Sequence, residues 1–241
     1  MGAIYELVLR VIQVCYPSSL TLMLATRESA GGVGMDGMLD DGDAEFIHWT
    51  HQRTWLNPPA SLEWMDRCVR EIQWDQPQVR VYGRWHRVPR LTAFLADHDV
   101  AYRYSGAVHQ GEGWPAWFQP LLEQVSQRCS APFNGCLFNL YRDGEDRMGW
   151  HADDEPEIDD AFPIASLSLG ATRDLQFRHR VSGCRHDLPL ADGDLLLMDR
   201  CCQQQWMHGL PVRKRVREPR LNLTFRVFRR ADGSAGSKAA R

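Results

Sequence analysis

Three residues of this chain have the types and the spacing of a metal site. His151 and Asp153 stand two positions apart in the segment 150–155. In extended backbone such side chains point to the same side, about 7 Å apart at their Cα atoms, so they can bind one ion together. His208 is the candidate third ligand, and two histidines with one carboxylate form the open site of non-haem Fe(II) proteins. A surface His-x-Asp sequence with an unrelated histidine is the alternative.

A strictly alternating segment, 219–228, offers an anion site. Apolar residues occupy one face, and the other face carries the polar residues Arg220, Asn222, Thr224 and Arg226. Two arginines on the inner face of a barrel strand would be costly to bury without an anion. Guanidinium groups bind carboxylates through paired hydrogen bonds, which predicts a small dicarboxylate between them. A solvated polar face on a half-buried strand is the alternative.

A second pair of polar groups follows the same spacing. Asn139 and Tyr141 stand at i and i+2, so both side chains face one side of an extended segment. An amide and a phenol there can hydrogen-bond the same dicarboxylate. Alone, this segment is ordinary strand sequence.

Short strands are predicted to carry these residues. The pattern predicts strands over 136–141, 164–169, 175–178, 195–198 and 221–228, separated by Gly-containing turns. Two helices are predicted before them, over 61–72 with Ser61 as the N-cap, and over about 117–128. Many short strands at this spacing favour a closed or sandwiched antiparallel sheet over a βαβ fold.

Length, charge and cysteine content narrow the class of protein. The 241 residues suit one domain with an irregular extension at 1–44 and a disordered tail at 231–241. No apolar run reaches the roughly 20 residues that span a bilayer, so no membrane partner is expected. Seven cysteines without a Cys-x-x-Cys pair favour reduced thiols over a disulfide framework. Residues 200–241 are basic and the remainder is acidic, which suggests a polyanionic partner or an ordinary basic surface.

Taken together, these segments resemble the AlkB-type Fe(II)/2-oxoglutarate dioxygenases, which repair alkylated nucleic acid bases. The matching residues occur in the expected order across roughly 80–228, in the segments 139–144, 151–155, 163–170, 208 and 219–226. A His-x-Asp pair and a distant histidine followed by an Arg-x-Asn-x-Thr-Phe-Arg strand are specific jointly, although each is weak alone.

The resemblance implies a fold, a metal and a cosubstrate. It implies a mainly β double-stranded β-helix (jelly roll) over 45–230, with flanking helices before it. It also implies Fe(II) held by His151, Asp153 and His208, and O₂ as a cosubstrate. The residues that it implies for 2-oxoglutarate are Asn139, Tyr141, Arg220, Asn222 and Arg226.

A closer likeness is to the branch of the family that repairs duplex DNA. Residues 81–90 resemble its hairpin that wedges a finger into the base stack, with Tyr82 at the finger position. Tyr102, Tyr104 and Ser105 resemble its lid over a flipped base, within a recognition region at about 78–108. A base inside a duplex must be extruded before chemistry can reach it. Packing of these aromatic side chains in a core or on the surface is the alternative.

Two further groups of residues complete the predicted substrate site. Arg213, Lys214, Arg215 and Arg217 lie in a basic segment that also resembles the duplex branch, and they are expected to hold phosphates. Asp154 and Glu155 are the candidates for contact with the edge of the base. A carboxylate there would favour the cationic bases N1-methyladenine and N3-methylcytosine.

The predicted function is oxidative demethylation of N-alkylated bases in DNA, with release of formaldehyde and conversion of 2-oxoglutarate to succinate and CO₂. The expected protein is a monomer in the cytoplasm with the nucleoid, or in the nucleus of a eukaryote. Two alternatives stay open: the same chemistry on RNA or protein, and a non-catalytic jelly roll that binds a metal or ligand.

Overall fold

The computed structural model describes residues 47–81, 83–104 and 107–230. The predicted extension at 1–44 and the predicted tail at 231–241 lie outside these residues, as do Tyr82 and Ser105. Within the described ranges, no helix combines the length and the apolar character that crossing a membrane requires.

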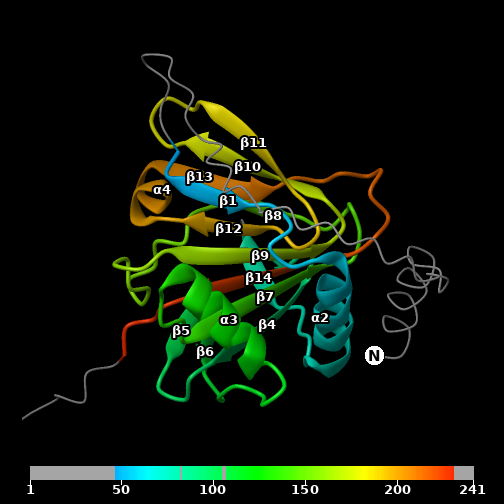
Figure 1. The fold of residues 1–241 in the computed structure, drawn as a ribbon. Coiled ribbons are helices and arrows are strands. Elements are labelled where there is room, and N and C mark those ends of the chain that lie inside the picture. Colours follow the sequence, from blue (N-terminus) through cyan, green and yellow to red (C-terminus); the bar gives the residue numbers. More distant parts are fainter. Residues whose placement is uncertain (1–46, 82, 105–106, 231–241) are drawn as a thin grey trace, which may run out of the picture.

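Two antiparallel sheets form the body of the molecule (Figure 1). The larger sheet has the order β1 (Trp49–Gln52), β12 (Leu195–Met198), β9 (Ile164–Gly170), β14 (Arg220–Arg226), β7 (Gly135–Tyr141) and β4 (Leu91–Ala96). The smaller sheet has the order β11 (Arg185–Leu190), β10 (Arg173–His179), β13 (Trp206–Leu210) and β8 (Met148–His151). Each predicted strand is present, within a few residues of its predicted ends.

The larger sheet lies between the long helices and the smaller sheet. Alternation along its strands creates two faces with different chemistry. In β9, Ala165, Leu167 and Leu169 join the core formed with α2 (Pro58–Glu71) and α3 (Gln119–Cys129). Ser166 and Ser168 are on the opposite face, where they hydrogen-bond polar side chains of β14. The helices therefore cover the apolar face, and a polar chamber is left between the sheets.

The start of α2 corrects the predicted helix boundary. The helix begins at Pro58, and the side chain of Asn57 caps it by accepting a hydrogen bond from the Ala60 amide at 3.0 Å. Proline suits the first helical positions, because an amide there has no partner inside the helix. The predicted N-cap, Ser61, is instead buried inside the helix and donates its hydroxyl to Asp192.

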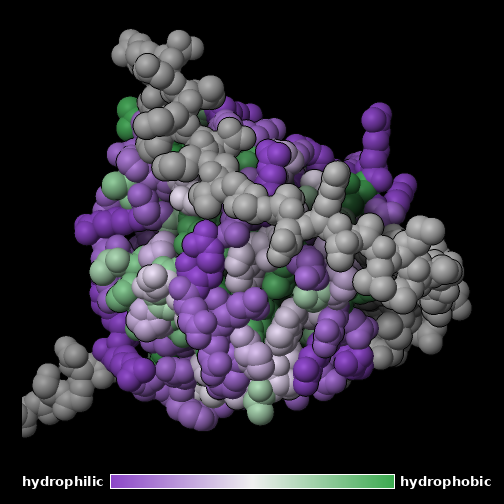
Figure 2. All heavy atoms as spheres, in the orientation of Figure 1, coloured by the Kyte–Doolittle hydropathy of each residue, from purple (hydrophilic) through white to green (hydrophobic). Residues whose placement is uncertain are grey.

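Two small hairpins flank β4 in the predicted recognition region. They consist of β2 (Gln78–Val81) with β3 (Arg84–Arg87), and of β5 (Ala101–Tyr104) with β6 (Ala107–Gln110). All four residues of β3 are exposed. Figure 2 shows a mostly hydrophilic visible surface with small separate hydrophobic areas, and Trp85 of β3 is 67% exposed.

Candidate functional site

The three predicted metal ligands come from two neighbouring strands and the turn that follows one of them. His151 ends β8, Asp153 follows two residues later, and His208 lies within β13. The two strands pair with His208 opposite His151, and their register shifts between His208 and Leu210. Because of this irregularity, Met148 and His151 both line the chamber although they are three residues apart.

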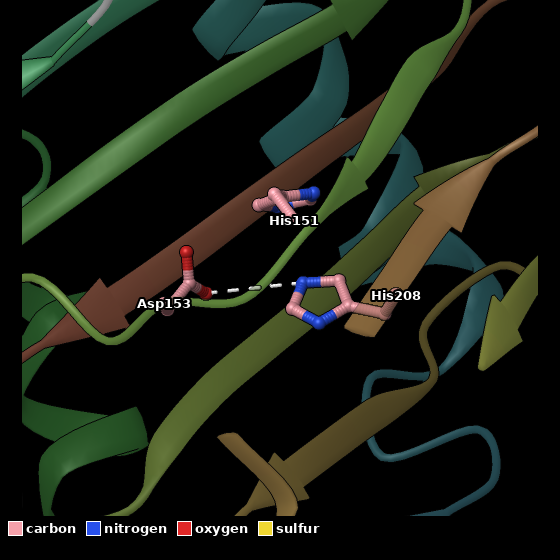
Figure 3. Close-up of side chains that lie close together, drawn as sticks. All are labelled: His151, Asp153 and His208. Carbon is pink, nitrogen blue, oxygen red and sulfur yellow. Dashed lines mark ion pairs between the residues drawn. The ribbon is translucent and has the colours of Figure 1, made fainter. Parts of the chain in front are cut away.

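The ligand atoms converge closely enough for one ion. One nitrogen or oxygen atom from each of His151, Asp153 and His208 lies within 4.8 Å of the other two. The imidazole centroids of the two histidines are 4.2 Å apart, and Nε2 of His208 is 4.0 Å from Oδ2 of Asp153. Figure 3 shows the three side chains directed toward one another. The structure thus brings together a His₂–carboxylate set that fits a non-haem iron.

The environment keeps two of these groups in the protonation state that a metal requires. Burial alone would raise the pKa of Asp153, but Arg226 and the two histidines outweigh it and lower that pKa to about 2. Burial and the neighbouring His151 lower the pKa of His208 to about 3. The carboxylate is therefore ionised and the imidazole of His208 is neutral at physiological pH.

Arg226 controls the orientation of the carboxylate. Its Nη2 donates to Oδ1 of Asp153 at 2.6 Å, and both side chains are buried. Burial alone would lower the pKa of Arg226, but Asp153, Tyr102 and Glu155 outweigh burial and raise that pKa above its ordinary value. One carboxylate oxygen is thus held by the guanidinium, while Oδ2 faces His208.

Arg220 occupies the other end of the same strand face. It is 2% exposed, and its Nη2 donates to the hydroxyl of Ser168 at 2.8 Å. Its guanidinium carbon lies 5.6 Å from the centre of the Tyr141 ring. Burial, with Arg173 close by, lowers the pKa of Arg220 to about 10, so the group stays charged at neutral pH.

Strand register aligns the remaining predicted cosubstrate residues. Tyr141 of β7 lies opposite Arg220 of β14, and Asn139 lies opposite Asn222. The amide of Asn222 is engaged within the sheet, since its Nδ2 donates to Ser166 and its Oδ1 accepts from Thr224. Tyr141 and Asn222 line the chamber with the two arginines.

Unpaired donors in this part of the molecule fit an anionic ligand. Nε of Arg220, Nε and Nη1 of Arg226 and Nδ2 of Asn139 are buried without a hydrogen-bond partner among the described residues. Buried donors of this kind are costly unless an acceptor reaches them. The chamber volume is about 20 Å³, so a five-carbon diacid would fit only in a wider form of the chamber. The donor set suits the two carboxylates of 2-oxoglutarate.

The predicted substrate residues are distributed unevenly around this chamber. Glu155 is partly buried and accepts a hydrogen bond from the Tyr102 hydroxyl at 2.9 Å, and burial beside Asp153 raises its pKa. The Tyr102 ring is buried against Phe94 and Phe228 rather than forming an open platform. Asp154 is exposed and pairs with Arg180 at 2.6 Å, so contact with a base would compete with that ion pair.

The other recognition residues are placed only in part. Tyr104 is the last residue of β5, but its side chain lies outside the described atoms, and Tyr82 and Ser105 are outside the described residues altogether. The finger and lid roles of these residues therefore stay predictions.

The basic segment forms a loop between β13 and β14. Lys214, Arg215 and Arg217 are exposed there. Arg213 is half-buried, and its Nε donates to Asp174 at 2.8 Å. Three of the four predicted phosphate contacts thus lie at the surface, whereas Arg213 is held by a carboxylate of β10.

The structure also identifies buried polar residues that the sequence did not single out. Arg90 donates its Nε to Oδ1 of Asn139 at 2.6 Å. Arg173 donates to the carbonyls of Asp143, Asp146 and Pro211, and so joins the two loops beside Tyr141. Gln203 accepts a hydrogen bond from the Asp153 amide. Arg173 stands just before the predicted strand 175–178 with no motif around it, so only its burial reveals its role.

Fold and site together define the class of protein. The profile of the 2OG-Fe(II) oxygenase superfamily matches residues 48–226, which contain the three predicted ligands and both arginines of β14. This chain belongs to the 2OG-Fe(II) oxygenase superfamily. The predicted Fe(II) and 2-oxoglutarate requirement is thereby confirmed at the level of the family.

Particular relatives support the predicted AlkB-type resemblance. DNA oxidative demethylase ALKBH2 of Homo sapiens is 42% identical over 157 residues, which cover 62% of this chain and 60% of that protein. The Bos taurus protein of the same name is also 42% identical, over 62% of this chain and 56% of its own length. Alpha-ketoglutarate-dependent dioxygenase alkB homolog 3 of Homo sapiens is 33% identical over 68% of this chain and 60% of that protein. The matches thus span somewhat over half the length of these curated relatives.

Solved structures confirm the fold. The structure of OsALKBH1 superposes with a TM-score of 0.54 at 16% identity, covering 77% of this chain and 100% of that one. A Pseudomonas putida prolyl-4-hydroxylase superposes with a TM-score of 0.51 at 16% identity, covering 77% and 94%. These likenesses bear out the predicted mainly β jelly roll.

Proposed function

We propose that this chain is an Fe(II)/2-oxoglutarate-dependent dioxygenase that demethylates N-alkylated bases in DNA. The observation that carries the proposal is the convergence of His151, Asp153 and His208 beside two buried arginines on one strand face. The names of the relatives supply the nucleic acid, since they include DNA oxidative demethylases.

The residues divide into a metal set and a cosubstrate set. His151, Asp153 and His208 would hold Fe(II). Asn139, Tyr141, Arg220, Asn222 and Arg226 would hold 2-oxoglutarate. When bound, iron and 2-oxoglutarate with O₂ supply the oxidation of the N-methyl group, which leaves as formaldehyde while 2-oxoglutarate becomes succinate and CO₂.

The two arginines would act on different ends of the cosubstrate. Arg226 contacts the ligand Asp153, so it lies at the metal end of the chamber. Arg220 lies six positions earlier on β14 beside Tyr141, which suits the distal carboxylate. Each guanidinium is buried, and its interaction with a carboxylate is therefore stronger than the same contact in water.

Glu155 would recognise the base. Its Oε2 is buried without a partner among the described residues, and Tyr102 holds the other oxygen. This carboxylate favours a cationic ring such as N1-methyladenine or N3-methylcytosine. Tyr82, Tyr104 and Ser105 would complete the extrusion and stacking of the flipped base, and Asp154 would join the base edge only after releasing Arg180.

DNA would be held along its backbone by the loop between β13 and β14. Lys214, Arg215 and Arg217 are exposed and can neutralise phosphates. Arg213 would contribute if it exchanged Asp174 for a phosphate. With DNA as the partner, we still predict a monomeric protein, located in the cytoplasm with the nucleoid or in the nucleus of a eukaryote.

A panel of methylated oligonucleotides tests the proposal against its alternatives. Succinate release is measured with Fe(II), ascorbate and 2-oxoglutarate on single-stranded and duplex DNA and on RNA, each with and without N1-methyladenine. Turnover that requires the methyl group on DNA is expected. Turnover on RNA alone would show that the substrate is RNA rather than DNA. Binding of 2-oxoglutarate without turnover on any substrate would favour a non-catalytic jelly roll.

A further inference from the structure

We propose that Gln203 is a positioning residue for the metal ligand Asp153, an inference that rests on the metal site proposed above. Oε1 of Gln203 accepts a hydrogen bond from the backbone amide of Asp153 at 3.0 Å. Both residues are 5% exposed, so water does not substitute readily for this contact. The bond joins positions 50 residues apart in the chain.

Gln203 is placed by the same short segment that delivers another ligand. It lies in α4 (Arg200–Gln205), which runs directly into β13 and His208. The side chain of Asp199 caps this helix by accepting from the Cys202 amide at 2.9 Å. The backbone amide of Trp206 closes the other end on the Cys202 carbonyl. The segment 199–208 therefore supplies one ligand and supports a second.

A neighbouring contact ties the next residue to the same helix. Nη2 of Arg180 donates to Oδ2 of Asp154 at 2.6 Å and to the backbone carbonyl of Gln203 at 3.1 Å. Asp153 is thus held through its main chain and Asp154 through its side chain. Together these contacts fix the turn that follows β8 against α4.

The hydrogen bond completes the restraint on the Asp153 carboxylate. Arg226 holds Oδ1, while Gln203 holds the main chain from which the side chain extends. With both contacts in place, Oδ2 is directed toward His208. Partners of this kind orient a metal ligand, and their loss typically weakens metal binding by about 10–100-fold.

The identity of the contact atom suggests discriminating variants. Oε1 makes the contact, and Nε2 of Gln203 has no hydrogen-bond partner among the described residues. Gln203→Leu removes the acceptor at similar size, whereas Gln203→Glu keeps an acceptor at that position. Gln205→Leu makes the same change on an exposed side chain of the same helix and serves as the matched control.

The test measures Mn(II) as a redox-stable probe of the full chain. The Kd is determined from the electron paramagnetic resonance signal of free Mn(II), at a temperature where circular dichroism shows every metal-free variant folded. We expect Gln203→Leu to raise the Kd about tenfold or more. Gln203→Glu and Gln205→Leu should stay within about threefold of the wild type, since neither removes the acceptor.

Several results would overturn the inference. One is a Gln203→Leu protein that binds Mn(II) as tightly as the wild type, and another is a Gln205→Leu protein that loses as much affinity. If Gln203→Leu does not fold, Gln203→Asn decides the matter, because its shorter side chain withdraws the acceptor, and unchanged affinity would contradict the role. A wild-type chain that binds no Mn(II) would instead remove the metal site itself, and this inference with it.

Discussion

The chamber between the sheets and the hairpins of the recognition region represent two ways of building a functional surface. All seven residues of β14 are buried, and its two arginines are held by Ser168 of β9 and by Asp153. All four residues of β3 are exposed, and among the described residues that strand pairs with β2 alone. The predicted chemistry thus lies in a packed chamber, whereas the predicted recognition role falls partly on an exposed two-stranded ribbon.

This contrast has an energetic reason. Charged groups such as Arg226 and Asp153 can be buried only when their hydrogen bonds are defined, which makes the site rigid. A two-stranded ribbon is marginally stable by itself, so it can adapt to a nucleic acid strand. Changes in the chamber should therefore have large effects on every substrate, and changes in the hairpins smaller effects that depend on the substrate.

The largest effect is expected from His151→Ala in the chamber. Loss of a residue that orients a metal ligand typically costs up to about 100-fold. Loss of a ligand itself should reduce turnover by more than that, on single strands and duplexes alike. Succinate release and Mn(II) binding measure the loss, and circular dichroism checks that the fold persists. Retained turnover would contradict the metal assignment.

Arg220→Leu should produce the next largest change. A charge-assisted hydrogen bond contributes about 1.5–3 kcal/mol, so the KM for 2-oxoglutarate should rise about 10–100-fold. Arg220→Lys keeps the charge without the paired geometry, so its KM for 2-oxoglutarate should lie between those of the wild type and Arg220→Leu. The result is read from initial rates against 2-oxoglutarate concentration, and an unchanged KM would exclude Arg220 from the cosubstrate site.

Acid stability distinguishes a buried histidine from an exposed one. The pKa of His208 is 6.5 in the unfolded chain and about 3 in the folded chain. Between these two pH values the unfolded chain therefore binds one proton more than the folded chain. The free energy of unfolding should therefore fall as the pH drops through that window, by up to about 1.4 kcal/mol per pH unit. Urea titrations of metal-free protein measure this slope.

Two substitutions test whether His208 causes the dependence of unfolding free energy on pH. His208→Gln should flatten it, whereas His86→Gln on the exposed strand β3 should leave it unchanged. The same slope in the wild type and in His208→Gln would show that other groups cause the acid sensitivity.

A smaller and selective effect is expected in the first hairpin. Tyr82→Ala should lower kcat/KM on duplex DNA about tenfold, in line with the 1–3 kcal/mol of a base–aromatic contact. Single strands should lose less than about twofold, because only a duplex requires a wedge. Trp85→Ala on β3 serves as the control, because the Trp85 side chain is aromatic and exposed. Equal losses on both substrates would remove the finger role from Tyr82.

The smallest effect is expected from one exposed cation of the loop between β13 and β14. Lys214→Ala should weaken binding by a few-fold and reduce the slope of log K against log salt by about 1. Fluorescence anisotropy at several salt concentrations measures that slope. Arg70→Ala on α2 serves as the control, and an equal change in both variants would show that Lys214 has no special position.

The sequence predicted the chamber better than the hairpins for a physical reason. Alternation along 219–228 reflects the period of a strand, so the shared face of Arg220 and Arg226 could be predicted. The His-x-Asp spacing was read in the same way, but His151 ends β8 and Asp153 lies in the turn after it. The register that brings His208 beside His151 depends on pairing between distant strands, and only the family resemblance supported it. The support that Gln203 gives to Asp153 has no local signature, because it joins a six-residue helix to a turn.

Helix capping shows a similar limit. Ser61 and Asn57 both have side chains that suit an N-cap, and the sequence pattern favoured the serine. The two prolines after Asn57 move the helix start upstream, where their missing amides cost nothing. Ser61 is then free to bind Asp192 across the core.

The most direct test of the whole account is a crystal structure of the full chain with Mn(II) and 2-oxoglutarate under anaerobic conditions. The account predicts one Mn(II) bound by His151, Asp153 and His208, with the two carboxylates of 2-oxoglutarate held near Arg226 and Arg220. Mn(II) bound elsewhere, or 2-oxoglutarate density away from both arginines, would contradict it.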